Sequence, residues 1–188
     1  LFLSYFDKDL LKNKIVGSSK LPVALVGLTV LILFAYLPFS GYLVSVNKSI
    51  SFPESMAALE QALQDMEGKF EELTSFIVAF DSFGQFLLGL LVIAVIPAIG
   101  EEYLFRGLIQ TYFGKIFSNK HVAIWVTAFI FAAFHFQFYG LFARMALGAL
   151  FGYLFWWSGR LIFAMLAHFI NNAVTLLGVY LYRSGSIE

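Results

Sequence analysis

The chain contains no cysteine, few charged residues and only four prolines. The absence of cysteine excludes disulfide bonds and thiolate catalysis. Charged residues make up 13% of the 188 residues and hydrophobic residues 60%, which is far from the usage of soluble globular proteins. Acidic and basic residues are equal in number, with twelve of each, so the positive excess of a nucleic-acid-binding protein is missing. We therefore expect a protein embedded in a lipid bilayer, with no nucleic-acid partner.

Long apolar segments are the most abundant feature of the chain. Each has about the 17–25 residues that a helix needs to cross a hydrocarbon core, although the third and fourth are short. They lie at about 21–46, 83–112, 121–138, 141–157 and 160–182. Tight hinges at 139–140 and 158–159 predict that the last three segments pack as antiparallel neighbours. The predicted fold is all-α, a polytopic bundle of about five transmembrane helices.

The stretch between the first two spans has a different pattern. Residues 56–77 place apolar side chains every three or four positions, which predicts an amphipathic helix with an acidic polar face. One interpretation is a lid or a substrate-docking helix. The other is a surface helix that lies on the membrane or on the bundle.

Lysine and arginine predict the orientation of the chain by the positive-inside rule. One side of the bundle would carry seven basic residues and the other side four. The seven are Lys8, Lys12, Lys14, Lys20, Lys115, Lys120 and Arg160, and the four are Lys48, Lys69, Arg144 and Arg183. The first group is therefore expected in the cytoplasm, and the amphipathic helix outside.

Two adjacent glutamates, Glu101 and Glu102, lie inside the second apolar segment. A carboxylate at bilayer depth is costly unless it is paired or faces water, so it is a functional hypothesis by default. On a helix, Glu102 and Arg106 share a face and can form an ion pair. Glu101 is rotated by about 100° from Glu102 and has no partner in this arrangement, which makes it a candidate general base. Pro97 frees the carbonyl of Ile93 and should bend the helix.

Polar residues also recur at helical spacing in the third and fifth segments. His135 follows Phe131 by one turn, and His168 and Asn172 project together because they are four residues apart. A lone histidine such as His135 is more often a satisfied core residue, and the second pair could simply join two helices. At about 1.5 Å per residue from the nearest basic residues, these groups and Glu101 lie deep enough to line one cavity.

Three motifs on successive membrane helices resemble those of the CPBP family, also called Abi. They are Glu-Glu-x-x-x-Arg at 101–106, Phe-x-x-x-His at 131–135 and His-x-x-x-Asn at 168–172. The family includes CaaX prenyl endoproteases and bacteriocin-processing proteases. The resemblance covers about residues 87–176 and implies a catalytic membrane domain at 83–188. Residues 1–82 would then carry the first span and the external amphipathic helix.

What the resemblance implies is an intramembrane endopeptidase. Its substrates would be membrane-associated proteins or peptides, processed either at a CaaX end or at a leader peptide. By the roles in the family, Glu101 and His135 would activate the attacking water, and His168 and Asn172 would hold the oxyanion. The expected location is a prokaryotic plasma membrane, as a multi-pass protein. The leucine at position 1 suggests a fragment of a longer membrane chain.

The same resemblance gives Glu102 and Arg106 a supporting role, in which they orient the catalytic groups. The leading expectation needs no cofactor. In the alternative, Zn²⁺ would be bound by Glu101, His135 and His168, since the family is often described as metalloproteases. The His-Glu-x-x-His motif of zincins is absent. Two other functions stay open: a proton-coupled transporter, and a catalytically idle immunity or scaffold protein.

Overall fold

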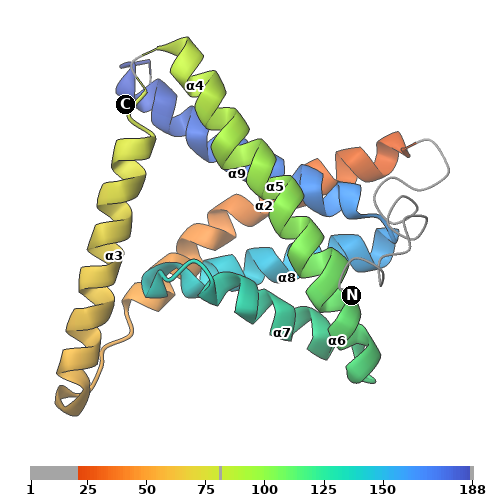
Figure 1. Ribbon diagram of the computed structural model, residues 1–188, viewed down its shortest axis with the longest axis horizontal. Coiled ribbons are helices and arrows are strands. Elements are labelled where there is room, and N and C mark those ends of the chain that lie inside the picture. Colours follow the sequence, from red (N-terminus) through yellow and green to blue (C-terminus); the bar gives the residue numbers. More distant parts are fainter. Residues whose placement is uncertain (1–20, 81, 187–188) are drawn as a thin grey trace, which may run out of the picture.

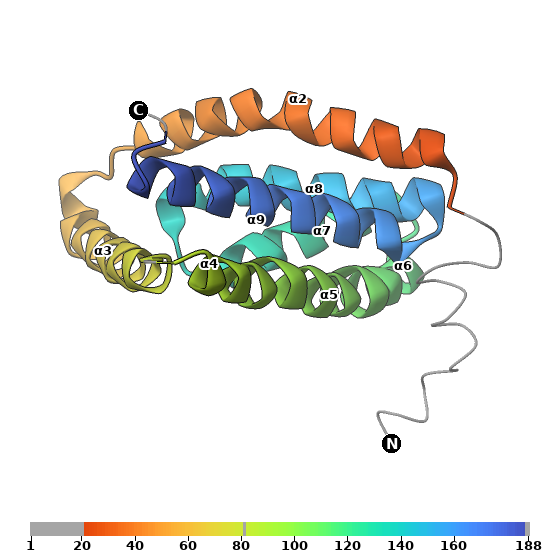
Figure 2. The same cartoon turned by 90° about the horizontal axis from the view of Figure 1, so that it is seen from above.

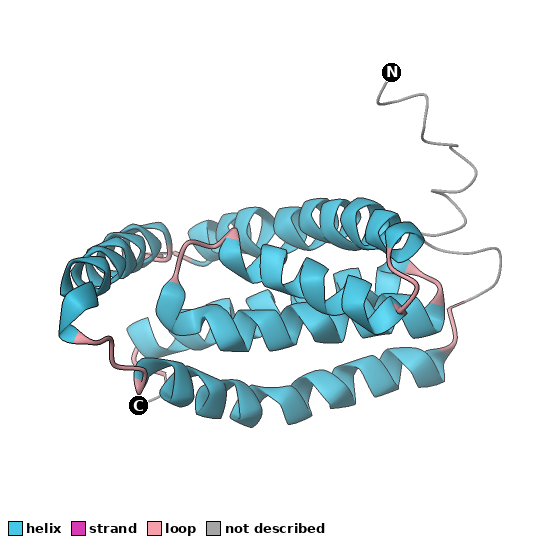
Figure 3. Ribbon diagram, turned by 90° about the horizontal axis from the view of Figure 1, so that it is seen from below, coloured by secondary structure: helices cyan, strands magenta, loops and turns pink. Residues whose placement is uncertain are grey.

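The computed structural model describes residues 21–80 and 82–186, which form helices joined by short loops and contain no strand (Figure 3). Within these residues, four helices are long and apolar enough to cross a membrane. They are α2 (Val23–Lys48), a continuous helix from Phe83 to Ile116, the segment Phe138–Ser158 and α9 (Leu161–Arg183). The all-α membrane bundle expected from the sequence is thereby confirmed.

The third apolar segment is shorter than expected. Its helix, α7 (Lys120–Ala133), has 14 residues and is about 21 Å long, less than the ~30 Å of a hydrocarbon core. The helix ends because Phe136 adopts a left-handed conformation, with φ of 54°, and Gln137 is extended. The chain then enters η5 (Phe138–Gly140) and turns back into α8 (Leu141–Ser158). Of the about five expected spans, four are thus long enough within the described residues, and α7 is a shorter apolar helix.

The second span is one long helix that alternates between two geometries. It consists of α4 (Phe83–Gly89), η3 (Leu90–Val95), α5 (Ile96–Glu102), η4 (Tyr103–Gln110) and α6 (Thr111–Ile116). The η3 and η4 stretches are π-helical. They flank the segment that carries the two glutamates, and π turns are frequent at functional sites.

Helix α8 lies at the centre of the bundle. It contacts α7, α9 and α2, and α9 in turn contacts α5 and η3. Figure 2 shows α2 and the long helix on opposite sides of α8 and α9. Two glycines allow the close contact of α8 with its neighbours: a Cβ at Gly148 would lie 3.0–3.3 Å from atoms of Phe131 and Ala128, and one at Gly152 would lie 2.9 Å from Ile124. Both glycines therefore lie at positions where a larger side chain would not fit without a shift of its neighbours.

The amphipathic segment forms α3 (Ala57–Ile77), which stands apart from the other helices in Figure 1. None of its residues is fully buried, and the half-buried apolar ones are Leu63, Met66 and Phe70. Its link to the bundle is made near η5, where the backbone N–H of Tyr139 donates to Oε2 of Glu67 at 3.3 Å. The helix is confirmed. Its functions as a lid or as a membrane-surface helix both stay predictions.

The helices alternate in direction, as the tight hinges predicted. The beginning of α2, the end of α6 and the α8–α9 junction lie at one end of the bundle, and α3 and α4 at the other (Figure 2). Lys115, Lys120 and Arg160 therefore share the first end, and Lys48 and Arg183 lie at the opposite one. The remaining lysines of the first group, Lys8 to Lys20, lie outside the described residues.

The orientation can be tested with single cysteines, because the chain has none of its own. Ser55 and Ser118 are exposed at opposite ends of the bundle. We expect a membrane-impermeant maleimide to label Ser55→Cys in intact cells and to label Ser118→Cys only after permeabilisation, because the positive-inside rule places residue 118 in the cytoplasm. The opposite labelling pattern would show that the chain has the reverse orientation in the membrane.

Candidate active site

An ion pair is buried in the middle of the bundle. Nη1 of Arg106 lies 2.7 Å from Oε1 of Glu102, and both side chains are completely inaccessible to solvent. Nη2 of Arg106 donates to the carbonyl of Gly148 on α8 at 2.8 Å. The guanidinium carbon also lies 4.6 Å from the ring centre of Phe131 and 5.3 Å from that of Phe151. The ion pair expected from the i, i+4 spacing is present, and two aromatic rings enclose it.

His168 lies between the two glutamates. Its Nδ1 is 2.8 Å from Oε1 of Glu102, and its Nε2 is 4.0 Å from Oε2 of Glu101. Because a carboxylate paired with Arg106 only accepts hydrogen bonds, Nδ1 carries the proton. The ring of His168 stacks on that of Phe151, with centres 5.1 Å apart and planes at 21°. As the helical spacing predicted, Arg106 pairs with Glu102 and not with Glu101, which lies within ion-pair distance of His168 from α9.

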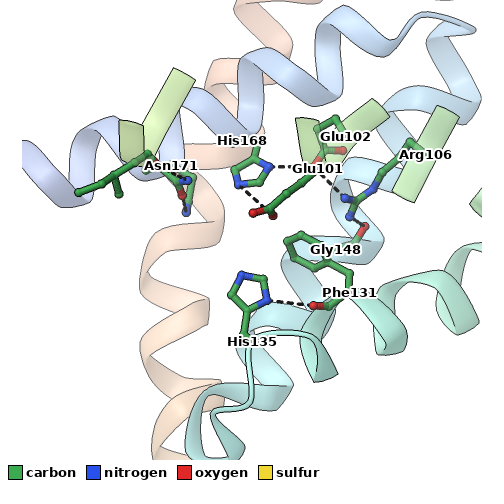
Figure 4. A network of polar contacts seen from close by, with 10 residues as sticks. Glu101, Glu102, Arg106, Phe131, His135, Gly148, His168 and Asn171 are labelled. Atoms are coloured by element: carbon green, nitrogen blue, oxygen red, sulfur yellow. Dashed lines mark hydrogen bonds and ion pairs between the residues drawn. The ribbon is translucent and has the colours of Figure 1, made fainter. Parts of the chain in front are cut away.

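Glu101 and His135 are the more open members of the site. The side chain of Glu101 is 35% exposed, and its Oε2 has no hydrogen-bond partner in the described part of the chain. Nδ1 of His135 lies 2.9 Å from the carbonyl oxygen of Phe131. A carbonyl only accepts, so Nδ1 carries a proton and Nε2 of the neutral ring is an acceptor. Figure 4 shows the side chains of Glu101, His135 and His168 directed toward a common space.

Asn172 makes a contact that the sequence analysis did not predict. Its Nδ2 donates to the carbonyl of Ile93 at 3.1 Å, and its Oδ1 accepts from Asn171 at 3.2 Å. The carbonyl of Ile93 is the one that Pro97 deprives of its α-helical donor. The structure therefore shows Asn172 joining α9 to the long helix. A side-chain amide has two N–H donors, so one of them remains for another acceptor.

The three residues of the zinc alternative do not form a ligand cluster. Among the residues that the structure describes, no three His, Asp or Glu side chains form a group that could hold a metal ion. The Nδ1 atoms of His135 and His168 are bonded to Phe131 and Glu102 respectively, which leaves Nε2 of each ring as the nitrogen that could bind a metal ion. The zinc alternative stays a prediction, which would need Glu101, His135 and His168 to lie closer together than they do here.

Sequence reasoning missed three contributors to the site. Phe151 stacks on His168, the carbonyl of Gly148 accepts from Arg106, and Gln110 donates to the carbonyl of Gly152 at 3.0 Å. Gly148 and Gly152 lack a Cβ, so α8 comes close enough to the long helix for their carbonyls to accept these two bonds. The donors, Arg106 and Gln110, are four residues apart, and so are the acceptors, Gly148 and Gly152. This matching spacing could have indicated that the two pairs face each other.

Comparison with known proteins assigns the region that contains the site. The family model for the type II CAAX prenyl endopeptidase, described as Rce1-like, matches residues 83–174. Residues 83–174 are therefore similar to the Rce1-like family. All three motifs fall within this range, and the resemblance to the CPBP family is confirmed there. With four apolar helices of membrane-spanning length in its described part, the chain is an integral membrane protein.

One relative is the uncharacterized protein YpbD of Bacillus subtilis (strain 168). It is 36% identical over 89 residues, which are 45% of this chain and 42% of that protein. The chain thus spans less than half the length of this relative. No solved structure gives a significant match to the chain.

The burial of the ion pair predicts a stability effect. Arg106→Ala leaves Glu102 and the Gly148 carbonyl without their donor in an apolar environment, so we expect a loss of about 3–5 kcal/mol. The melting temperature in detergent should fall clearly. Arg183→Ala, at the exposed end of α9, is the matched control and should leave it unchanged. An unchanged melting temperature for Arg106→Ala would mean that the pair is solvated.

Proposed function

We propose that this chain is an intramembrane endopeptidase in which Glu101 and His135 activate water to hydrolyse a peptide bond. One observation carries the proposal: the two adjacent glutamates have different surroundings. Glu102 is completely buried and its Oε1 accepts from both Arg106 and His168, whereas the side chain of Glu101 is 35% exposed and forms no ion pair with Arg106. A partly exposed carboxylate beside an imidazole acceptor is suited to take a proton from water.

The proposed reaction begins when the water oxygen attacks the carbonyl carbon of the peptide bond. Glu101 takes one proton of the water, assisted by Nε2 of His135, and a tetrahedral oxyanion forms. When this intermediate collapses, the C–N bond breaks and the proton passes from Glu101 to the leaving amine. The match to the family model and the tautomer of His135 support this assignment.

The oxyanion would be held by His168 and Asn172. Because Nδ1 of His168 already donates to Glu102, a second donor at Nε2 requires the imidazolium form. Asn172 would contribute the N–H that does not bind Ile93. Donors fixed in this way stabilise developing charge strongly, since they need no reorganisation during the reaction.

Glu102 and Arg106 act as positioning residues in this proposal. Glu102 fixes His168 through Nδ1, and Arg106 fixes Glu102 while bound to the backbone of α8. Phe151 sets the plane of the imidazole by stacking. Such constraints matter because a displacement of about 1 Å in a reacting group can cost 10²-fold in rate.

The substrate is proposed to be a membrane-associated protein or peptide. The family description favours a prenylated CaaX end, and a leader peptide is the other candidate. We further propose that the reaction uses no metal ion and takes place in a prokaryotic plasma membrane. A proton-coupled transporter or an idle scaffold protein would yield no cleaved product, which separates these alternatives from a protease.

The first test is Glu101→Gln, which keeps the shape of the side chain and removes the base. Turnover should fall by at least about 10²-fold while the melting temperature is unchanged. The probes are a fluorogenic farnesylated peptide with a CaaX end and an unprenylated leader-type peptide, with the protein reconstituted in vesicles. The control Glu102→Gln should lower the melting temperature as well, because Glu102 is the buried partner of Arg106.

The same preparations decide the metal question. Activity that survives strong chelators, with no stoichiometric zinc by elemental analysis, is expected. If the protein contains one zinc ion per chain, and His135→Ala loses both the zinc and the activity, the metal-free mechanism is wrong. Normal cleavage by a Glu101→Gln, His135→Ala double variant would remove the protease function from this site.

A second test concerns Asn172. Asn172→Ala should reduce kcat by about 10²–10³-fold with little change in KM, because an oxyanion donor acts mainly in the transition state. Asn171→Ala is the matched control, since it removes a neighbouring amide, which donates to Asn172, and leaves the bond from Asn172 to Ile93 in place. If Asn172→Ala lowers the melting temperature but leaves kcat unchanged, Asn172 has only a structural role, through its bond to Ile93, and does not hold the oxyanion.

A further inference from the structure

A cavity of about 290 Å³ is lined by residues of the long helix, α7 and α8. The end of α6 and the α8–α9 junction lie at the end of the bundle opposite α3 (Figure 2). The lining of the cavity includes Gln110 and Thr111 from the long helix, Lys115 from α6, Lys120 from α7, and Phe155 and Trp156 from α8. None of the proposed catalytic residues lines it. The cavity is therefore separate from the candidate active site.

The lining is basic on one side and aromatic on the other. It contains two lysines and no acidic residue. The ammonium of Lys120 donates to the carbonyl of Gly114, and an ammonium has three donors, so it can bind a further acceptor. Trp156 is 41% exposed and the adjacent Trp157 68%. Exposed tryptophans next to lysines at the ends of membrane helices are typical of the membrane–water interface.

We propose that this cavity binds the headgroup of an anionic phospholipid. The phosphate would lie between Lys115 and Lys120, and the glycerol end would leave along Phe155 and Trp156 toward the bilayer. Basic pockets between membrane helices at the cytoplasmic surface bind anionic headgroups, and the orientation predicted above places the cavity at that surface. Its volume is at the lower limit for ligand pockets, which suits a headgroup without its acyl chains.

The cavity is connected to the catalytic region through Gln110. Nε2 of Gln110 donates to the carbonyl of Gly152 at 3.0 Å, one helical turn from the bond of Arg106 to Gly148 at 2.8 Å. These two parallel bonds join η4 to α8. A headgroup packed against Gln110 would hold the outer of the two bonds in place, so lipid binding should raise the melting temperature of the protein.

The test compares two double variants of exposed lysines. Lys115→Gln with Lys120→Gln alters the cavity, and Lys48→Gln with Lys69→Gln alters the same number of lysines at the opposite end. Binding of phosphatidylglycerol and of phosphatidylcholine to the purified proteins is measured by native mass spectrometry and by the shift in melting temperature. The wild type and the second double variant should prefer phosphatidylglycerol, and the cavity variant should bind it about 30-fold more weakly, at about 1 kcal/mol per lysine.

Three outcomes would overturn the proposal. They are an equal loss in both double variants, an unchanged preference in the cavity variant, and displacement of the lipid by millimolar glycerol 3-phosphate, which would indicate a site for a soluble anion. Glu101→Gln should keep the lipid preference. The headgroup site and the proposed protease activity can therefore fail independently.

Discussion

A guanidinium buried in an apolar helix bundle is the constraint on which the rest of the site depends. Arg106 is completely inaccessible to solvent, so its charge must be neutralised and its donors must find acceptors inside the protein. Glu102 supplies the charge, and the carbonyl of Gly148 supplies a further acceptor. Residue 148 has to be small, because a Cβ there would lie 3.0 Å from Phe131. The close contact of α8 with the long helix and α7 thus follows from the burial of one side chain.

The same constraint separates the roles of the two glutamates. Glu102 is committed to Arg106 and His168 and is fully buried, so it cannot readily serve as a base for water. Glu101 is adjacent in sequence but points to a different side of the helix, where it is partly exposed. An ion pair needed for stability in the membrane therefore also fixes an imidazole beside a carboxylate that is available for chemistry.

Much of the fold and part of the site could be predicted because the signals are local. The ion pair follows from a spacing of four residues, and the hinges at Gly140 and Gly159 predicted antiparallel packing. The end of α7 could not be predicted, since residues 134–138 remain largely apolar and the helix stops through the backbone conformation of Phe136. The contacts of His168 with Glu102 and Phe151 join residues distant in sequence, and no single-segment pattern contains them.

Pro97 explains why the side-chain amide of Asn172 donates to the backbone carbonyl of Ile93. Proline lacks an N–H, so the carbonyl of Ile93 cannot accept its α-helical hydrogen bond, and an unsatisfied carbonyl in hydrocarbon costs several kcal/mol. Asn172 donates to this carbonyl and thereby fixes α9 against the long helix. Glu101 lies one turn after Pro97 on the long helix, and His168 lies one turn before Asn172 on α9. The bond from Asn172 to Ile93 and the bond from His168 to Glu102 therefore both hold α9 against the segment that carries Glu101.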